Sequence, residues 1–356
     1  MKTITGISIA CVLFACAVPR ARAAEINADL KALSTAAAKE GSLDLSWSQG
    51  TLGGSQGAAL IEAGMNKYFG TNIRLKFTPG PEVARIGNQI ATEFQAKQPA
   101  TTDVYLAAAA QIAPLVQFDM FEAADWAKLL PQRIKPDMTE VRGQFVRLNT
   151  GLSGVTYNSA MAPMKPTTLE DFLKPEWKGK IASTPYAASF DVFLADDMWG
   201  KQKTIDYVKK LSAQISGLMR CGDAERIATG EFLALVMDCT GQDALIWQER
   251  GAPLEQMIPL DAAQERFNYF GVPKNAKSPN AAKLFTVFMM TQEGQKLAYD
   301  TWKTDLHQFP EAHIRKTVDI YSAKGVNFKE VSIEWWLKHP EIDEGKSELI
   351  KILTSK

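Results

Sequence analysis

The chain has 356 residues, which is long enough for two domains of ordinary size. Its hydrophobic content of 46% and its charged content of 22% are typical of a globular protein and exclude a disordered or fibrous chain. The 40 basic residues balance the 40 acidic ones without long runs of one sign, so nothing indicates a nucleic-acid partner.

The N-terminus has the pattern of a cleavable secretion signal. Lys2 precedes the uncharged apolar residues 4–18, and Ala-Arg-Ala at residues 21–23 fits the small-x-small rule for cleavage. The apolar stretch is too short to span a bilayer. We therefore predict that residues 1–23 are removed and that the mature chain is periplasmic. The alternative is lipidation at Cys16.

The first third of the chain alternates between helix and strand patterns. Helical spacing predicts helices at residues 28–39, 58–69 and 82–98, and alternation predicts strands at residues 42–47, 73–77 and 103–106. Short connections give the order βαβαβ. This order favours an α/β fold with a mostly parallel sheet and helices on both faces.

Strand patterns dominate the middle of the chain, and helical patterns dominate its end. Strands are predicted at residues 144–148, 154–157, 180–182, 215–221, 232–239 and 266–272. Helices are predicted at residues 190–198, 280–290 and 293–302, and two more lie between residues 331 and 353 on either side of Pro340. No flexible linker separates these elements.

Residues 176–190 read as a short strand followed by a small polar loop and the start of a helix. The first N–H groups of such a helix would be free, and the helix dipole would attract an anion to them. Ser183, Thr184 and Ser189 would add hydroxyl groups at this position. The alternative is an ordinary strand–loop–helix turn with a serine cap.

Three stretches resemble periplasmic solute-binding proteins of ABC importers, in the branch that includes the ferric-ion-binding proteins. They are TTLEDFLKPEWKGKIA (residues 167–182), IATGEFLALVMDCT (residues 227–240) and VPKNAKSPNAAKLFTVFMMTQEGQKLAYD (residues 272–300). The resemblance implies the two-domain, type II periplasmic-binding-protein fold, in which two crossing strands form a hinge below the ligand cleft.

The resemblance also implies how the chain divides. Residues 24–150 with about 271–320 would form the first α/β domain, and residues 151–270 with the C-terminal helices would form the second. The expected partners are an inner-membrane ABC permease and a small ligand, and we expect a monomer without a cofactor.

The ferric branch binds its metal with a pair of adjacent tyrosines after a strand of the second domain. The corresponding segment of this chain, residues 239–247, reads CTGQDALIW and has no tyrosine pair. Ferric ion would need oxygen-rich tyrosinate ligation. The expected helix start at residues 183–189, the glycine-rich loop after Trp47 and Arg220 predict a small organic anion, a carboxylate or a phosphonate, as the ligand. A ferric-ion carrier and a secreted enzyme on the same fold are the alternatives.

Candidate ligand-binding residues follow the strands, because ligands of open α/β sheets lie beyond the carboxyl ends of strands. They are Trp47, Ser48, Gln49 and Gly50 after the first strand, Ala108 after the third, and Arg220, Thr240 and Asp243 after two strands of the second domain. Arg220 suits a carboxylate or a phosphonate because a guanidinium binds such groups in a bidentate manner.

Tyr157 and Tyr269 lie on the two presumed crossing strands and would line the base of the cleft. Packing within the hinge is the alternative for both tyrosines. No catalytic pattern accompanies these candidates: the three histidines lie near the C-terminus without metal-binding spacing, and no G-x-S-x-G elbow is present. We expect a binding protein and not an enzyme.

Cys221 and Cys239 are the two cysteines that would remain after cleavage of the signal, in a compartment that permits disulfides. Each closes an apolar run that reads as a strand. Neighbouring parallel strands lie about 4.8 Å apart, and similar ends would bring the two sulfur atoms within bridging distance. We predict a disulfide, and two buried free thiols are the alternative.

Overall fold

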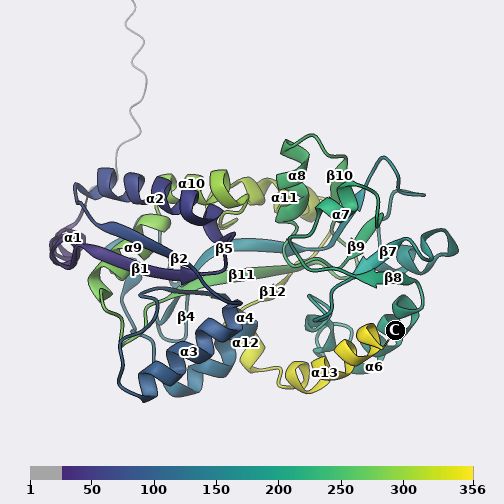
Figure 1. Ribbon diagram of the computed structural model, residues 1–356, viewed down its shortest axis with the longest axis horizontal. Coiled ribbons are helices and arrows are strands. Elements are labelled where there is room, and N and C mark those ends of the chain that lie inside the picture. Colours follow the sequence, from purple (N-terminus) through teal and green to yellow (C-terminus); the bar gives the residue numbers. More distant parts are fainter. Residues whose placement is uncertain (1–25, 356) are drawn as a thin grey trace, which may run out of the picture.

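The computed structural model describes residues 26–355 and forms two lobes joined by long strands (Figure 1). The predicted secretion signal, residues 1–23, lies outside the described residues. Between residues 26 and 355, no helix is both long enough and apolar enough to cross a membrane.

The first lobe is built around a parallel pair of strands that is flanked by helices. Its N-terminal elements are α1 (Ala28–Glu40), β1 (Ser42–Trp47), α2 (Gly54–Phe69), β2 (Arg74–Pro79) and α3 (Val83–Gln95). α1 begins where the Asn27 side chain accepts a hydrogen bond from the Leu30 N–H group, and it ends at Gly41, whose φ of 69° favours glycine. These five predicted elements are confirmed, although α2 begins earlier than expected.

The third predicted strand does not extend the parallel sheet. β3 (Tyr105–Ala108) pairs antiparallel with β11 (Gln264–Gly271), and β1 and β2 form a sheet of two strands. The segment before β3 runs beside β1, and the Asp103 N–H group donates to the Asp44 carbonyl over 2.8 Å. The Asp44 N–H group, however, donates to the Asp103 side-chain carboxylate over 2.8 Å and not to a backbone carbonyl. The mostly parallel sheet expected from the βαβαβ order is therefore wrong for this lobe.

Two strands run side by side between the lobes, as Figure 1 shows. β5 (Phe145–Ser153) continues through Gly154 into β6 (Val155–Asn158), and β11 pairs antiparallel with β5 along its length. β4 (Thr139–Glu140) and β12 (Lys329–Val331) lie at the two edges of the same sheet. The two crossing strands that were predicted are present.

The pairing of β5 with β11 contains a bulge that changes the direction of the side chains. Asn268 is opposite Asn149, but the next residue, Tyr269, is opposite Arg147, so Leu148 has no partner. Residues opposite each other share a face of the sheet. Neighbouring residues of a strand, such as Asn268 and Tyr269, point to opposite faces of the sheet. Their partners Asn149 and Arg147 therefore also point to opposite faces, whereas residues two positions apart in a regular strand would share a face.

The second lobe has a mixed five-stranded sheet in the order β10-β6-β9-β7-β8. Its further strands are β7 (Ile181–Ser183), β8 (Ile215–Leu218), β9 (Ala234–Val236) and β10 (Leu254–Met257), and its helices include α6 (Lys201–Ser212), α7 (Glu225–Ala228) and α8 (Gln242–Glu249). β7 pairs in parallel with both β8 and β9, so it separates these two strands.

The helix predicted at residues 190–198 is wrong, because that segment contains only the short 3-10 turn Val192–Leu194. Ala187 and Ser189 have φ values of 53° and 62°, which a continuous helix start does not allow. Phe190 and Phe193 are fully buried. The apolar spacing therefore reflects a loop packed into the core. No long helix follows Ser189 to supply the predicted N-terminal anion site.

The remaining helices complete both lobes. They are α4 (Ala109–Ile112), α5 (Trp126–Leu129), α9 (Pro279–Met289), α10 (Gln292–Trp302), α11 (His313–Ser322), α12 (Ile333–Leu337) and α13 (Glu341–Thr354). The two predicted C-terminal helices are present, with Pro340 between them. α13 lies against α6 of the second lobe, where the Ser212 hydroxyl donates to the Ile352 carbonyl over 3.1 Å.

Candidate functional site

A pocket of about 590 Å³ lies between the two lobes, above the crossing strands. Its first-lobe wall includes Ser48, Thr51, Glu82, Val83, Ala84, Leu106, Ala108, Ala110 and Gln111. Its second-lobe wall includes Tyr186, Ala188, Asp191, Arg220, Cys221, Cys239, Thr240 and Gln242. Arg266, Phe267 and Asn268 of β11 contribute to the floor, and Lys346 reaches the pocket from α13.

The first-lobe wall presents the N-terminus of α3 to the pocket. Glu82 is the N-cap residue, and no side chain caps the helix. Val83 and Ala84 form the first turn, and both line the pocket. The first N–H groups of a helix have no partner within the helix, and the dipole makes this end positive. This wall can therefore donate hydrogen bonds to a negatively charged group.

The second-lobe wall carries an unpaired cation. Arg220 follows β8 and is exposed to the pocket. Its backbone N–H group donates to the Asp223 carboxylate over 3.2 Å, which fixes the main chain at this position. Across residues 26–355, no group forms an ion pair or a hydrogen bond with its guanidinium. Arg220 can therefore bind an anion without giving up an internal partner.

The other two cations of the pocket are held by one buried carboxylate. Lys346 Nζ lies 2.8 Å from Asp191 Oδ2, and Arg266 Nη1 lies 3.6 Å from Asp191 Oδ1. Arg266 Nη1 also donates to Ser189 Oγ over 3.0 Å. Burial alone would raise the pKa of Asp191, but Lys346 and Arg266 lower it below its usual value. Asp191 therefore stays ionised and holds both cations beside the pocket.

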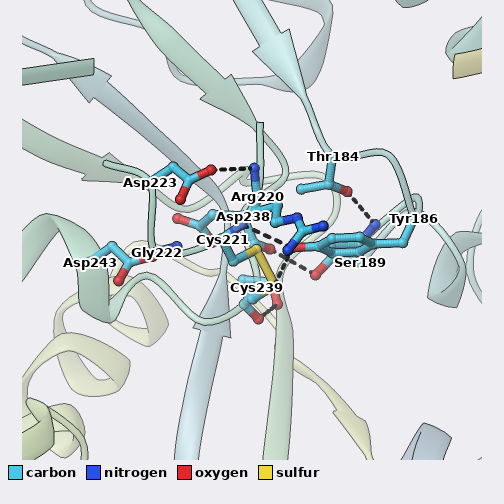
Figure 2. Close-up of a disulfide and its surroundings, with 12 residues drawn as sticks. Thr184, Tyr186, Ser189, Arg220, Cys221, Gly222, Asp223, Asp238, Cys239 and Asp243 are labelled. Atoms are coloured by element: carbon cyan, nitrogen blue, oxygen red, sulfur yellow. Dashed lines mark hydrogen bonds between the residues drawn. A yellow bond between two sulfur atoms is a disulfide. The ribbon is translucent and has the colours of Figure 1, made fainter. Parts of the chain in front are cut away.

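The predicted disulfide between Cys221 and Cys239 is present, and both residues line the pocket (Figure 2). The reason given for it was only partly right, because β8 and β9 are not neighbours. The loops after these strands instead meet beyond the end of β7, with a Cα–Cα distance of 6.0 Å. The Tyr186 hydroxyl lies between them and accepts a hydrogen bond from the Cys221 N–H group over 2.9 Å.

Four predicted site residues meet in this pocket: Ser48, Ala108, Arg220 and Thr240. The Trp47 side chain is buried instead, and its indole N–H group donates to the Val104 carbonyl over 2.8 Å. The exposed residues Gln49 and Gly50 follow Ser48 but do not line the pocket. The strand-end rule therefore located the pocket, but not each side chain that faces it.

The three predicted hydroxyl donors are fully buried and make internal hydrogen bonds. Ser183 donates to the Val236 carbonyl, Ser189 donates to the Asp238 carbonyl over 2.9 Å, and Thr184 accepts from the Ala188 N–H group over 2.8 Å. They stabilise the second-lobe wall through these internal hydrogen bonds and do not face the pocket themselves. Ser189 contacts Arg266, and Thr184 holds the Ala188 N–H group, so both are linked to residues that line the pocket.

Asp243 and the two predicted tyrosines also lie outside the pocket lining. The Tyr157 hydroxyl donates to Glu255 over 2.7 Å. Asp243 accepts a hydrogen bond from the Gly222 N–H group over 2.8 Å, and burial raises its pKa. Tyr269 does not line the pocket, and its hydroxyl donates to Glu140 over 2.7 Å on the opposite face of β11 from Arg266 and Asn268.

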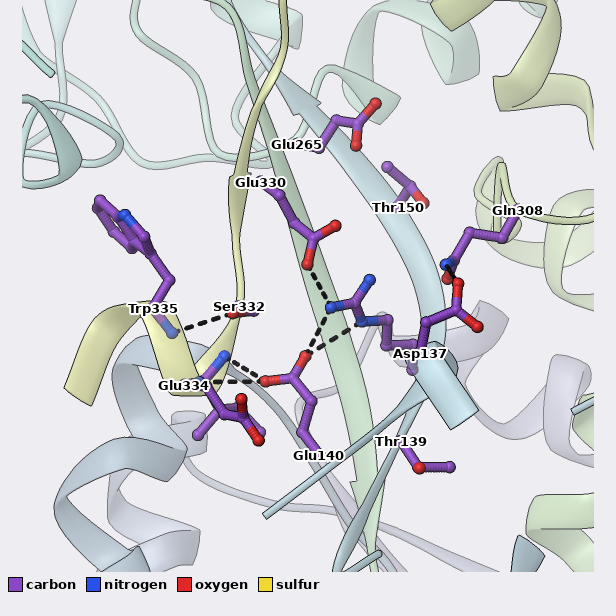
Figure 3. Close-up of polar contacts among 12 residues, drawn as sticks. Asp137, Thr139, Glu140, Thr150, Glu265, Gln308, Glu330, Ser332, Glu334 and Trp335 are labelled. Atoms are coloured by element: carbon purple, nitrogen blue, oxygen red, sulfur yellow. Dashed lines mark hydrogen bonds and ion pairs between the residues drawn. The ribbon is translucent and has the colours of Figure 1, made fainter. Parts of the chain in front are cut away.

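That opposite face holds a charge cluster, which we define as Glu140, Arg147, Glu265, Tyr269 and Glu330; all but the exposed Glu330 are buried, and Figure 3 shows the three glutamates. Arg147 binds Glu140 over 2.9 Å and Glu330 over 2.5 Å. The Tyr269 hydroxyl donates to Glu140 over 2.7 Å. Glu265 is left outside these pairs, and burial raises its pKa to about 7. The cluster ties β4, β5, β11 and β12 together.

Sequence reasoning missed Arg266, Asn268, Lys346 and the start of α3. Alternation along β11 could have placed Arg266 and Asn268 on one face, but it did not tell which face meets the ligand. Lys346 lies far along the chain, on a helix that could not be placed beside the pocket. Across residues 26–355, no group of His, Cys, Asp and Glu side chains could hold a metal ion.

The chain matches the family model for a bacterial extracellular solute-binding protein over residues 61–305. The chain belongs to this family. A substrate-binding protein of an ABC transporter from Agrobacterium tumefaciens has a similar structure, with a TM-score of 0.71, 18% identity, and coverage of 88% of this chain and 94% of the other. The fold is that of the type II periplasmic binding proteins, as the sequence indicated.

Other solved relatives bind different ligands on this fold. AfuA from Actinobacillus pleuropneumoniae, with fructose-6-phosphate bound, has a TM-score of 0.65 and 19% identity over 87% of this chain and 96% of its own. Iron-bound HitA from Pseudomonas aeruginosa has a TM-score of 0.65 and 14% identity over 86% of this chain and 99% of its own. At these identities the likeness shows the fold and not the ligand.

Two proteins also match in sequence. A Haemophilus influenzae protein without an assigned function is 27% identical over 143 residues, which are 38% of this chain and 40% of that protein. The Fe(3+)-binding periplasmic protein of Serratia marcescens is 25% identical over 171 residues, which are 45% of this chain and 49% of that protein. Each match therefore spans less than half the length of the relative.

Proposed function

We propose that this chain is the periplasmic solute-binding component of an ABC transporter and that it binds a small organic anion in the pocket between its lobes. The observation that carries the proposal is the unpaired guanidinium of Arg220, which faces the pocket together with the uncapped start of α3. An anion between these two groups would connect the second lobe to the first. Such a connection favours the closed arrangement of a hinged protein.

The charges of the pocket support an anion. Arg220, Arg266 and Lys346 are its cationic side chains, and Asp191 and Glu82 are its carboxylates. Asp191 neutralises part of the charge of Arg266 and Lys346, and Glu82 is exposed at the edge of the pocket. A cation as ligand would meet the guanidinium of Arg220 without a counter-charge. An anion would complete the set of ion pairs.

The remaining lining supports an organic ligand over a bare inorganic ion. Leu106, Val83, Tyr186 and Trp302 provide apolar surface. A volume of about 590 Å³ lies within the range of about 300–1,000 Å³ that is usual for small-molecule sites. A carboxylate or phosphonate with a carbon skeleton would use both the polar and the apolar parts of this pocket.

We further infer that the two lobes are domains that move about β5 and β11. Residues 24–150 with about 271–320 would form one domain, and residues 151–270 with the C-terminal helices would form the other. A closed, ligand-bound form would dock on an inner-membrane permease as a monomer. Solute-binding relatives support this transport role over an enzymatic one.

Ferric-ion transport is the second candidate, favoured by the partial match to the Serratia marcescens protein. Against it, the segment after β9 has no tyrosine pair. We expect the purified protein to be colourless and to gain no visible charge-transfer band when ferric citrate is added. A stoichiometric visible band would favour the ferric candidate over an organic anion.

Identifying the molecule that co-purifies tests the proposal. The protein, expressed with its own signal and isolated from the periplasm, would be denatured, and the released small molecules would be analysed by mass spectrometry. Calorimetric titration with phosphonoacetate, succinate, putrescine and ferric citrate would follow. The proposal expects an anion with a carboxylate or phosphonate group. Recovery of a neutral or cationic compound that also binds on titration would contradict it.

A further inference from the structure

The loop that carries Arg220 has no backbone pairing to the neighbouring part of the pocket wall. β8 lies at the edge of the second-lobe sheet, and β7 separates it from β9. The loops after β8 and β9 nevertheless lie together at the pocket, where Arg220 and Thr240 form part of the same wall. Something other than a strand ladder must therefore hold them in place.

The disulfide provides this connection, and it lies next to the pocket residues Arg220 and Thr240. Cys221 directly follows Arg220, and Cys239 directly precedes Thr240. The bridge therefore fixes the main chain at the residues that are joined by a peptide bond to Arg220 and to Thr240. Figure 2 shows Arg220, the bridge and the ring of Tyr186 close together at the end of the strands.

Two hydrogen bonds support the same loop. The Tyr186 hydroxyl accepts from the Cys221 N–H group over 2.9 Å, and Asp243 accepts from the Gly222 N–H group over 2.8 Å. The Tyr186 hydroxyl also lies 4.0 Å from Cys239 Sγ, so it contacts both ends of the bridge. The Tyr186 hydroxyl is therefore a second contact that holds the loop, and the substitution Tyr186→Phe removes it while the disulfide remains.

The rest of the loop is anchored independently of the bridge. Met219 and Ala224, on either side of residues 220–223, are buried in an apolar cluster with Ile227 and Phe232. Loss of the bridge would therefore loosen residues 220–223, leaving their hydrogen bonds to Tyr186 and Asp243, without removing the packing on either side of them. This makes a local effect on the pocket separable from a general effect on the fold.

We propose that the Cys221–Cys239 disulfide, assisted by the Tyr186 hydroxyl, positions the guanidinium of Arg220 for anion binding. The effect on affinity rests on the proposed function, but the effect on the loop does not. The bridge is a positioning element: it acts through Arg220 and makes no ion pair with the anion itself. An unrestrained loop would have to be ordered on binding, and that ordering lowers affinity.

The first experiment needs no ligand. Hydrogen–deuterium exchange would compare the wild-type protein, the double variant Cys221→Ser/Cys239→Ser, and Tyr186→Phe. We expect faster exchange in the peptide that covers residues 219–224 in both variants, with the larger change in the double variant. Tyr207→Phe is the matched control, because this buried hydroxyl of the same lobe donates to Leu169 away from the pocket. Unchanged exchange in residues 219–224 of the double variant would overturn the proposal.

The second experiment uses phosphonoacetate as the probe in a double-mutant cycle. Removing the bridge should lower the affinity about tenfold when Arg220 is present, because the freed loop must be ordered on binding. In the Arg220→Ala background the same change should cost less than about twofold, since the group being positioned is absent. Equal losses in both backgrounds would contradict a role through Arg220.

The two experiments separate this inference from the proposed function. If wild-type protein does not bind phosphonoacetate, the proposed ligand class fails for this probe, and the exchange experiment still decides whether the bridge holds the loop. If phosphonoacetate binds but bridge removal changes neither exchange nor affinity, the proposed function stands and the positioning role is wrong.

Discussion

The two sides of β11 are lined by arginines in opposite situations. On the pocket side, Arg220 of the loop after β8 has a guanidinium with no partner among residues 26–355, whereas Arg266 of β11 itself is held by Asp191. On the other face, Arg147 is buried and binds both Glu140 and Glu330. The same residue type is therefore available to a ligand on one side of the strand and fully engaged by the protein on the other.

This difference separates the charges that stabilise the folded state from the charges that remain free to bind a ligand. A buried cation with two carboxylate partners contributes to the sheet, and removing it leaves those carboxylates uncompensated. A half-exposed cation without a partner contributes little to folding but can form a new ion pair with a ligand. Pairing, more than residue type or closeness to the cleft, distinguishes the two roles.

The largest expected effect breaks the paired side of the comparison. Arg147→Ala would leave Glu140 buried without its cation and would remove the guanidinium from the Phe267 ring, 4.1 Å from it. Breaking a buried pair in this way typically costs about 3–5 kcal/mol of unfolding free energy. Denaturant unfolding at pH 7 would measure it.

Arg250→Ala serves as the matched control for this variant. Arg250 is exposed, and its guanidinium lies 5.0 Å from the Trp247 ring without a carboxylate partner in the described part of the chain. We expect it to change the unfolding free energy by less than about 0.5 kcal/mol. Equal effects of the two variants would show that the charge cluster adds nothing to stability.

The next effect concerns Glu265, the carboxylate of the charge cluster that is left without an arginine. Burial, with a smaller contribution from the Glu330 carboxylate, raises its pKa from 4.5 to about 7, while Arg147 opposes the shift. The folded state therefore binds a proton that the unfolded state releases. Its contribution to stability is present below about pH 4.5 and is lost as the pH rises towards about 7.

Glu265→Gln should remove this dependence. The unfolding free energy of the variant, relative to wild type, should rise by on the order of 2–3 kcal/mol between pH 4.5 and pH 7.5. His307, which faces Glu265, acts in the opposite direction: burial lowers its pKa to about 4, so its contribution is lost as the pH falls below about 6.5. Because His307 Nε2 lies 3.7 Å from Glu265, the comparison is made in a His307→Gln background, which removes the His307 titration from both proteins. A flat difference across this range would contradict the buried-carboxylate account.

The smallest expected effect sharpens the comparison on the pocket side. Ser189→Ala would remove a hydroxyl that accepts from Arg266 and donates to the Asp238 carbonyl. Arg266 keeps Asp191 nearby, so we expect a loss of only about 1 kcal/mol in unfolding free energy. Thermal unfolding at pH 7 measures it. A loss as large as that of Arg147→Ala would mean that Arg266 is a structural cation too.

The sequence predicted much of the fold because local patterns and caps agree with it. The elements from α1 to α3, the two crossing strands and the C-terminal helices follow from spacing, glycine and proline signals. The helix expected at residues 190–198 failed because apolar residues that fill a core loop imitate helical spacing. The pairing of β3 failed because the side chains of Asp103 and Thr102 accept hydrogen bonds from N–H groups of β1 that a neighbouring strand would otherwise accept.

The candidate site was harder to predict than the fold. The ends of strands pointed to Ser48, Ala108, Arg220 and Thr240, and the structure brings these four into one pocket. The faces to which Arg147 and Asn149 of β5 point depend on a bulge at Leu148, which no sequence signal marks. Lys346 depends on how a distant helix packs, so local patterns carry no information about it.

The central claim is that the unpaired guanidinium of Arg220 binds an organic anion. Calorimetric titration of wild type, Arg220→Ala and Arg250→Ala with the anion recovered from the native protein tests it most directly. We expect Arg220→Ala to lose at least about tenfold in affinity, with unchanged circular dichroism, because a charge-assisted contact is removed. Arg250→Ala should bind as wild type does. Unchanged affinity in Arg220→Ala would contradict the account.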